Sequence, residues 1–281
     1  MGWFGFGRAR DPKKELEAVL GRYELPSFPA VASDVLRRLR DPDGELSAAA
    51  DRLAEDPGLT QRVLGLANAS AYALRHPVRS VAHAVSLLGR SEVESLVLAV
   101  VVRHSLPNPT GPGFDGARFW RSAARRAAAA RAVADRVAPA GRSDSFTAAL
   151  LSDMAVPLLC AARGEAYGEV LQQWHAAGGD LASLERDALG WDHPTVAGWM
   201  ARRWRFPERL TDAIAVHHES ADDEGLLPAV GLVAPLGEAE GAGVEQVVEE
   251  VAGRYGLPRD EIVALLAEAE TQAGEIAARM A

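Results

Sequence analysis

Asp153 is the residue whose chemistry the sequence constrains most tightly. It lies in the stretch Ser143–Ala162, which after a Ser-Asp pair is apolar on almost every side and predicts a helix buried all round. A buried carboxylate without a partner is costly or must give up its charge. Asp153 therefore requires a cation, a metal ion or a set of hydrogen-bond donors.

Three histidines are candidates for that partner. His193 begins an expected helix after Asp192, and His217 with His218 lies near the end of another. An imidazole at a helix end can donate to carboxylates or carbonyls and hold a bundle together. We favour a structural pairing of one of these histidines with Asp153 over metal ligation. The sequence shows no glycine-rich phosphate loop, Cys-x-x-Cys motif or serine–histidine–aspartate order.

A basic helix face is a further candidate site. In the expected helix 115–137, Arg118, Arg121 and Arg125 fall on one side and a row of alanines on the other. Such a face is commonly a solvated surface, and the alternative is a site for an anion or an acidic partner. The alanine face predicts close packing against another helix.

The corner after Asn68 is a candidate interaction surface. A helix is expected to end there, and Tyr72 and Arg75 follow in the segment after it. The corner leaves polar and aromatic groups where a partner could dock. A purely structural role, in which Asn68 only caps the turn, is equally consistent with turn chemistry.

Helical patterns and tight corners alternate along the chain without a strand period, so the predicted fold class is all-α. Helices are expected to begin at Ser47, Asp56, Ser80, Ser91 and Asp115. Pro107–Gly113 is dense in residues that cannot continue a helix and marks a linker. The expected division is a tail with a short helix at 1–24, a helical subdomain at 25–106, the linker at 107–114, a helical bundle at 115–238 and a C-terminal helical tail at 239–281.

Composition excludes several classes of protein. The 281 residues carry a net charge of -9, which would repel a phosphate backbone, so nucleic acid is not an expected partner. One cysteine excludes an internal disulfide and fits a reducing compartment. The longest apolar run, Leu96–Val102, is far shorter than the ~20 residues of a membrane span. We expect a cytoplasmic protein with no transmembrane segment.

Five motifs, in this order and spacing, resemble those of the HDOD domain. They are Leu-Pro-Ser-Phe-Pro at 25–29, Asp-Pro-Asp at 41–43, Glu-Asp-Pro-Gly-Leu at 55–59, Leu-Ala-Asn-Ala-Ser at 66–70 and Ala-Val-Ser-Leu-Leu-Gly at 84–89. The resemblance extends over about 25–238. It implies an all-helical bacterial regulatory module whose second half is similar to HD-domain metal-dependent phosphohydrolases.

The same resemblance implies that the metal centre of those enzymes is degenerate in this chain. Four of the family's functional positions hold residues of the wrong chemistry: Ser122 and Ser152 replace histidines, Val156 replaces a lysine, and Pro235 stands near the closing aspartate. The surviving positions are Asp153, His193, His217 and His218. We therefore expect no catalytic residue, no bound metal and no cofactor.

The leading functional prediction is a non-enzymatic signal-transduction regulator or adaptor that acts by contact with protein partners. The alternative is a receptor for an anionic second messenger such as cyclic di-GMP, bound in the vestigial pocket or on the face of Arg118, Arg121 and Arg125. The least favoured alternative is a residual HD-type metal-dependent phosphohydrolase.

Overall fold

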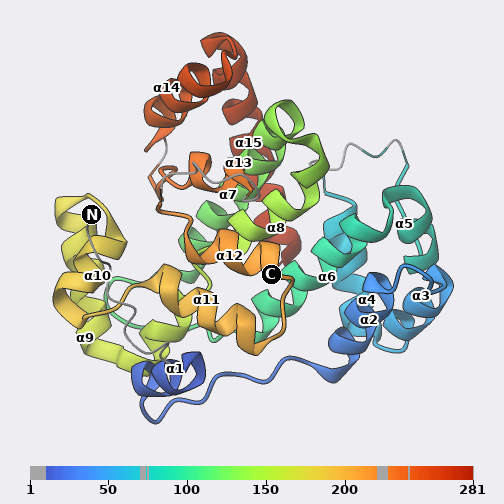
Figure 1. Ribbon diagram of the computed structural model, residues 1–281, viewed down its shortest axis with the longest axis horizontal. Coiled ribbons are helices and arrows are strands. Elements are labelled where there is room, and N and C mark those ends of the chain that lie inside the picture. Colours follow the sequence, from blue (N-terminus) through green and yellow to red (C-terminus); the bar gives the residue numbers. More distant parts are fainter. Residues whose placement is uncertain (1–10, 70–73, 75, 220–226, 240, 281) are drawn as a thin grey trace, which may run out of the picture.

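The computed structural model describes residues 11–69, 74, 76–219, 227–239 and 241–280, and all regular elements in these ranges are helices (Figure 1). The predicted all-α class is therefore confirmed. The first half contains α1 Pro12–Leu20, α2 Ala30–Arg40, α3 Leu46–Ala54, α4 Pro57–Ala67, α5 Val81–Leu88 and α6 Arg90–Ser105. The second half contains α7 Gly116–Val137, the 3-10 turn Pro139–Gly141, α8 Arg142–Leu151, α9 Ala155–Ala177, α10 Leu181–Leu189, α11 His193–Arg203, α12 Glu208–Ala215 and α13 Pro228–Val233. Two further helices follow, α14 Val244–Tyr255 and α15 Arg259–Met280.

Three of the five helix starts predicted from cap residues are confirmed. The side chains of Asp56, Ser80 and Asp115 accept amide hydrogens from the first turns of α4, α5 and α7. The expected starts at Ser47 and Ser91 are wrong, because α3 begins at Leu46 and α6 at Arg90. The Ser47 hydroxyl donates to the carboxylate of Glu45, 3.3 Å away, so it does not cap the helix.

The stretch Ser143–Ala162 is not one helix. It forms the end-to-end pair α8 and α9, separated by a turn at 152–154. Pro157 explains the break, because its ring would clash with the carbonyl of Asp153 in a continuous helix, whereas the first turn of α9 tolerates it. Asp153 therefore lies in a turn at the start of α9. Farther along, α9 kinks at Gly164, whose φ of 49° suits glycine.

The two halves pack through α6 and α8. Figure 1 shows α2 to α5 on one side of the molecule and α9 to α11 on the other, with α6 and α8 between them. Glu92 on α6 is buried and accepts hydrogen bonds from Arg131 of α7, at 2.9 and 3.0 Å, and from Ser143 of α8, at 2.5 Å. This carboxylate therefore ties three helices of the two halves together.

The linker is packed against the second half. His175 of α9 lies 2.9 Å from the carbonyl oxygen of Gly113 through Nε2. A β-carbon at Gly113, whose φ is 80°, would lie 2.9 Å from the β-carbon of Leu171, so glycine allows this close approach. The linker is thus held against α9.

The C-terminal segment belongs to the body of the protein. Helix α15 lies along α7 and buries Ile262, Leu266, Ile276 and Met280. Helix α7 packs on both α15 and α8, and most of its alanines are buried. The region 239–281, expected as a tail, therefore completes the core through α15.

The N-terminal helix packs on the second half, against α9 and α11. Residues 21–29, which we call the strap, then run without regular structure from α1 to α2 along one edge of the molecule (Figure 1). The indole Nε1 of Trp204 donates to the carbonyl of Pro26 at 3.0 Å, and the Phe28 ring centroid lies 5.8 Å from that of Trp204. These contacts fix the strap across the two halves.

One run, Pro139–Ala177, meets the length and composition criteria of a membrane span, although no such run was expected. However, 78% of its most apolar window is buried inside the protein. The run is also interrupted by the turn at 152–154 and the kink at Gly164. These are features of core helices, so the apolar character reflects packing.

Replacing Glu92 should destabilise the protein strongly. Glu92→Ala removes the buried carboxylate that faces Arg131, and breaking a buried ion pair in this way costs roughly 3 kcal/mol. Arg136→Ala is the matched control. It removes a 2.7 Å ion pair with Glu261, in which both side chains are about 40% exposed, and should cost under about 1 kcal/mol. Urea unfolding of the three proteins measures both changes. Equal losses in the two variants would contradict the role given to Glu92.

Candidate functional site

Asp153 is the centre of a buried polar cluster. Its Oδ2 accepts a hydrogen bond from the guanidinium of Arg126, and its Oδ1 lies 3.1 Å from His217 Nε2 and 3.4 Å from His193 Nε2. The side chain of Arg126 is 8% exposed and that of Asp153 is 20% exposed. The expected contact between Asp153 and a histidine is present, and an arginine that sequence reasoning had missed adds the opposite charge.

Each histidine is oriented through its Nδ1 atom. His193 Nδ1 lies 2.7 Å from Glu185 Oε2, His217 Nδ1 lies 2.8 Å from the carbonyl of Ile214, and His218 Nδ1 lies 3.0 Å from Asp180 Oδ1. These acceptors fix the ring orientations and leave the Nε2 atoms of His193 and His217 directed at Asp153. The ligand atoms of Asp153, His193, His217 and His218 all lie within 4.8 Å of one another.

Arg126 connects the positions where the resemblance placed lost metal ligands. Its Nη1 donates to Ser122 Oγ at 3.1 Å and to the carbonyl of Leu236 at 3.2 Å, while its Nη2 donates to Asp153. Ser122 lies one helical turn earlier on α7, and its small side chain leaves room for the guanidinium. Leu236 follows Pro235. The arginine therefore occupies the space between the remaining carboxylate and two of the altered positions.

The cluster continues into the second half as a chain of hydrogen bonds. Tyr167 donates its hydroxyl to Glu185, and Glu185 also accepts the backbone amide of His193 at 2.6 Å. Tyr167, Glu185 and His193 are all fully or almost fully buried. Polar groups of four helices are thus joined in one internal network, in which Arg126 Nε and His193 Nε2 have no hydrogen bond of their own.

The network sets the protonation of its members. Burial alone would raise the pKa of the Asp153 carboxyl, but Arg126, His193 and His217 outweigh it and hold that pKa well below its usual value. Burial alone would lower the pKa of His193, but Glu185 and Asp153 raise it to about 10. Burial and the neighbouring His217 and His193 lower the pKa of His218 to about 3. At neutral pH the centre therefore contains ionised Asp153, protonated His193 and neutral His218.

The crevice that opens onto this cluster is very small. Its volume is about 30 Å³, and its lining includes Ser122, Arg126, Asp153, Val156 and Glu238. A volume of this size holds one or two water molecules. Side chains of the linker and of α7 and α9 fill the remaining space, so the crevice is too small for a nucleotide.

The residues present do not fit a hydrolytic metal centre. Asp153 is the cluster's anionic ligand position, and it is already neutralised by Arg126 and by protonated His193. A divalent cation would have to displace a proton from His193 and lie beside a fixed guanidinium. Both requirements oppose metal binding. Ser122, Ser152 and Pro235 offer no charged oxygen or imidazole nitrogen to compensate. The donor set is therefore that of an ion-pair network.

The basic face of α7 is paired with carboxylates, and only its Arg125 is buried. Arg118 lies 2.9 Å from Glu238 Oε2, and Arg121 and Arg125 each lie 3.2 Å from carboxylate oxygens of Glu270 on α15. Arg125 is buried and also donates to the carbonyls of Gly237 and Ala239. The face is therefore solvated at Arg118 and Arg121 and covered at Arg125, with matching carboxylates from Glu238, before α14, and from Glu270 of α15.

Asn68 is a structural corner. Its side-chain amide donates to the carbonyls of Leu64 and Val78 at 2.8 and 2.9 Å, and its Oδ1 accepts the amide of Val78 at 2.7 Å. The side chain therefore closes the loop that follows α4. Tyr72 and Arg75, the other members of that candidate surface, lie outside the described residues.

Comparison with known proteins supports this fold. The solved structures similar to it include a candidate phosphohydrolase from Shewanella amazonensis SB2B, with TM-score 0.74, 22% identity, and coverage of 96% of this chain and 98% of that one. An HDOD domain protein of unknown function from Geobacter sulfurreducens has TM-score 0.71 and 23% identity, with coverage of 96% of this chain and 98% of that one. A candidate signal transduction protein from Marinobacter aquaeolei VT8 has TM-score 0.74 and 22% identity, with coverage of 96% of this chain and 65% of that one. At these identities the likeness concerns the fold.

Among curated proteins, an uncharacterized protein of Treponema pallidum (strain Nichols) is 21% identical over 202 residues. The match covers 69% of this chain and 38% of the length of that relative. The family model of the HDOD domain matches residues 25–220, which is most of the chain and includes both halves of the fold. The chain therefore belongs to the HDOD family.

Proposed function

We propose that the protein is a non-enzymatic regulator of signal transduction that works by contact with other proteins. One observation carries this proposal: Arg126 binds Asp153 and fills the position between it and the altered sites Ser122 and Pro235. A fixed guanidinium supplies the positive charge that a metal would bring, but it cannot activate water. Family membership and a neighbour described as a candidate signal transduction protein are consistent with a regulatory role.

The charges of the cluster support the same proposal. Asp153 and Glu185 are balanced by Arg126 and protonated His193, and every one of these groups has a partner inside the protein. General acid–base catalysis requires a group within reach of a substrate, with a pKa near the operating pH. The crevice of about 30 Å³ admits no substrate to these groups. The network is suited to holding four helices in one arrangement.

The second-messenger alternative has less support. The crevice is too small for a cyclic dinucleotide, and Arg118, Arg121 and Arg125 are occupied by Glu238 and Glu270. An anion would have to displace these carboxylates. A reducing location in the cytoplasm, consistent with the single cysteine, remains part of the proposal.

The metal content of two variants tests the proposal. Wild-type protein dialysed against Co²⁺ and then against buffer should retain no stoichiometric metal, and it should not hydrolyse bis-(p-nitrophenyl) phosphate or cyclic di-GMP. Arg126→Met removes the competing cation, so Co²⁺ affinity should rise at least tenfold, visible in the absorption spectrum of the bound ion. Arg121→Met, on the exposed side of the same helix, is the matched control and should behave as wild type.

Thermal melting of each variant shows whether it is folded. About one metal ion per wild-type chain, lost on changing His217 to alanine, would overturn the proposal. Hydrolysis of either substrate that depends on Asp153 would also overturn it.

Stability should fall as the pH rises above neutral because of His193. The pKa of a histidine is about 6.5 in the unfolded chain, and it is about 10 in the folded protein. A raised folded pKa adds stability that is complete below about pH 6.5 and is lost as the pH rises toward 10. The free energy of unfolding in urea should therefore decrease from pH 7 to pH 8.5, a window below the titration of tyrosine and lysine.

His193→Gln is the control for this pH dependence, because glutamine can hydrogen-bond but does not titrate. Its unfolding free energy should change less over the same window. Parallel pH profiles of the two proteins would show that His193 is not the source of the effect.

A further inference from the structure

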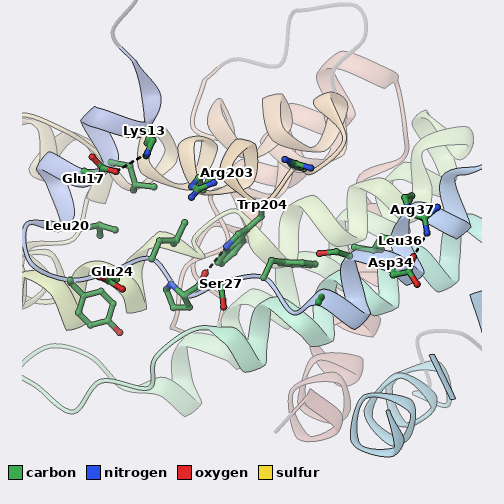
Figure 2. A pocket seen from close by; sticks show the side chains of 18 of the residues that line it. Lys13, Glu17, Leu20, Glu24, Ser27, Asp34, Leu36, Arg37, Arg203 and Trp204 are labelled. Atoms are coloured by element: carbon green, nitrogen blue, oxygen red, sulfur yellow. Dashed lines mark hydrogen bonds and ion pairs between the residues drawn. The ribbon is translucent and has the colours of Figure 1, made fainter. Parts of the chain in front are cut away.

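A large groove, which shares no lining residue with the crevice at Asp153, lies beneath the strap. Its volume is about 1340 Å³, and its walls are α1, the strap, α2 and residues 203–205, which begin with the last residue of α11. Figure 2 shows Trp204 between Leu20 on one side and Leu36 on the other, with Lys13 and Glu17 at one end. Pockets for small ligands span about 300–1,000 Å³, so this groove has the size for a longer occupant.

Part of the groove's lining is apolar. Leu16, Leu20 and Leu36 are buried in it. The Trp204 ring packs between Phe28 and Phe206, with centroids 5.8 and 6.0 Å away, and its indole N–H is bound to the strap. The buried leucines favour aliphatic side chains in an occupant, and Tyr23, which also lines the groove, adds an aromatic ring.

The strap supplies unpaired backbone amides. It is extended, and among the described residues the amides of Glu24, Leu25, Ser27 and Phe28 have no hydrogen-bond acceptor within the protein. Backbone donors of an extended segment are the groups with which a second extended chain pairs. The whole of 23–28 lines the groove, so such a chain could lie along it.

The groove also holds two cations without counter-ions. Arg203 and Arg205 are exposed, and within the part of the chain that the structure describes neither has a carboxylate within 4.0 Å. In contrast, Arg37 is paired with Asp34 and Arg40 with Glu94. Of the acidic residues in the lining, Glu17 and Asp34 are in ion pairs. Glu24 lies on the strap and Asp41 follows α2. The end of α11 itself thus presents two positive charges without a carboxylate.

The backbone at this end is strained. Arg205 has a φ of 58° and is the non-glycine residue with positive φ among those described. It follows the end of α11 where glycine is the usual residue, and its carbonyl is held by Arg40 at 3.2 Å. An arginine in place of glycine here sacrifices some stability but places a second cation beside Arg203. Strain of this kind is typical of functional positions.

We propose that this groove binds an extended segment of a partner protein. The segment would pair its backbone with the strap, place aliphatic side chains over Leu16, Leu20 and Leu36, and direct an acidic side chain to Arg203 and Arg205. This inference rests on the proposed regulatory function and names the kind of partner that would carry it. The whole chain carries excess negative charge, so a local pair of free arginines gives selectivity for an acidic segment.

Selection from a phage-displayed library of random 12-residue peptides on the full chain tests the proposal. The enriched peptides should combine Asp or Glu with aliphatic residues, and a fluorescein-labelled representative should bind in solution by anisotropy. The double variant Arg203→Glu/Arg205→Glu should weaken that binding at least tenfold. Ala30→Trp, at an exposed position of the lining, should weaken it similarly by filling the groove.

Arg202→Glu is the matched control, because Arg202 lies on the same helix, is 50% exposed and is outside the lining. Its peptide affinity should stay within twofold of wild type, and melting curves should show that all variants are folded. Absence of enriched peptides, unchanged binding to both groove variants, or binding of cyclic di-GMP that the groove variants abolish would each overturn the proposal.

These outcomes are separate from those that test the regulatory function. Bound metal or hydrolysis would overturn the proposed function whatever the groove binds. Failure of the peptide experiments in a protein without metal or hydrolysis would remove the groove proposal alone.

Discussion

The ion pair between Arg126 and Asp153 is the constraint around which the second half of the fold is arranged. A buried carboxylate requires compensating charge and donors, and it receives them from α7 through Arg126, from α11 through His193 and from the segment after α12 through His217. Pro157 places the carboxylate in a turn, where several helices can reach it. Loss of any one partner would leave charge uncompensated, so the helices are held in one arrangement.

The sequence predicted the helical class and the need of Asp153 for a partner, because hydrophobic period and burial are local properties of the chain. It did not predict the break between α8 and α9, because the apolar pattern continues on both sides of Pro157. It also missed Arg126, which lies beside the basic face on the helical wheel. Only the packing of α7 on the turn at 152–154 shows that this side chain points inward.

The basic face of α7 shows a second limit of prediction from the sequence. Arg121 and Arg125 are neutralised by Glu270, which is more than 140 residues away in the chain. The amphipathic pattern of α7 identifies a charged side but cannot tell solvent from a covering helix. The regular apolar face of α15 was the available signal that it packs on another helix, and Glu270 of α15 then pairs with the arginines of α7.

Helix α11 connects the two unlike regions of the protein. His193 at its first residue is bound to Asp153 and Glu185 in a closed network, whereas Arg203 at its last residue borders the open groove. A helix of 11 residues is about 16 Å long and moves as one body. The ionic network anchors one end of it, so a segment bound at the other end meets a preformed surface. Preorganisation of this kind reduces the entropy lost on binding at that surface.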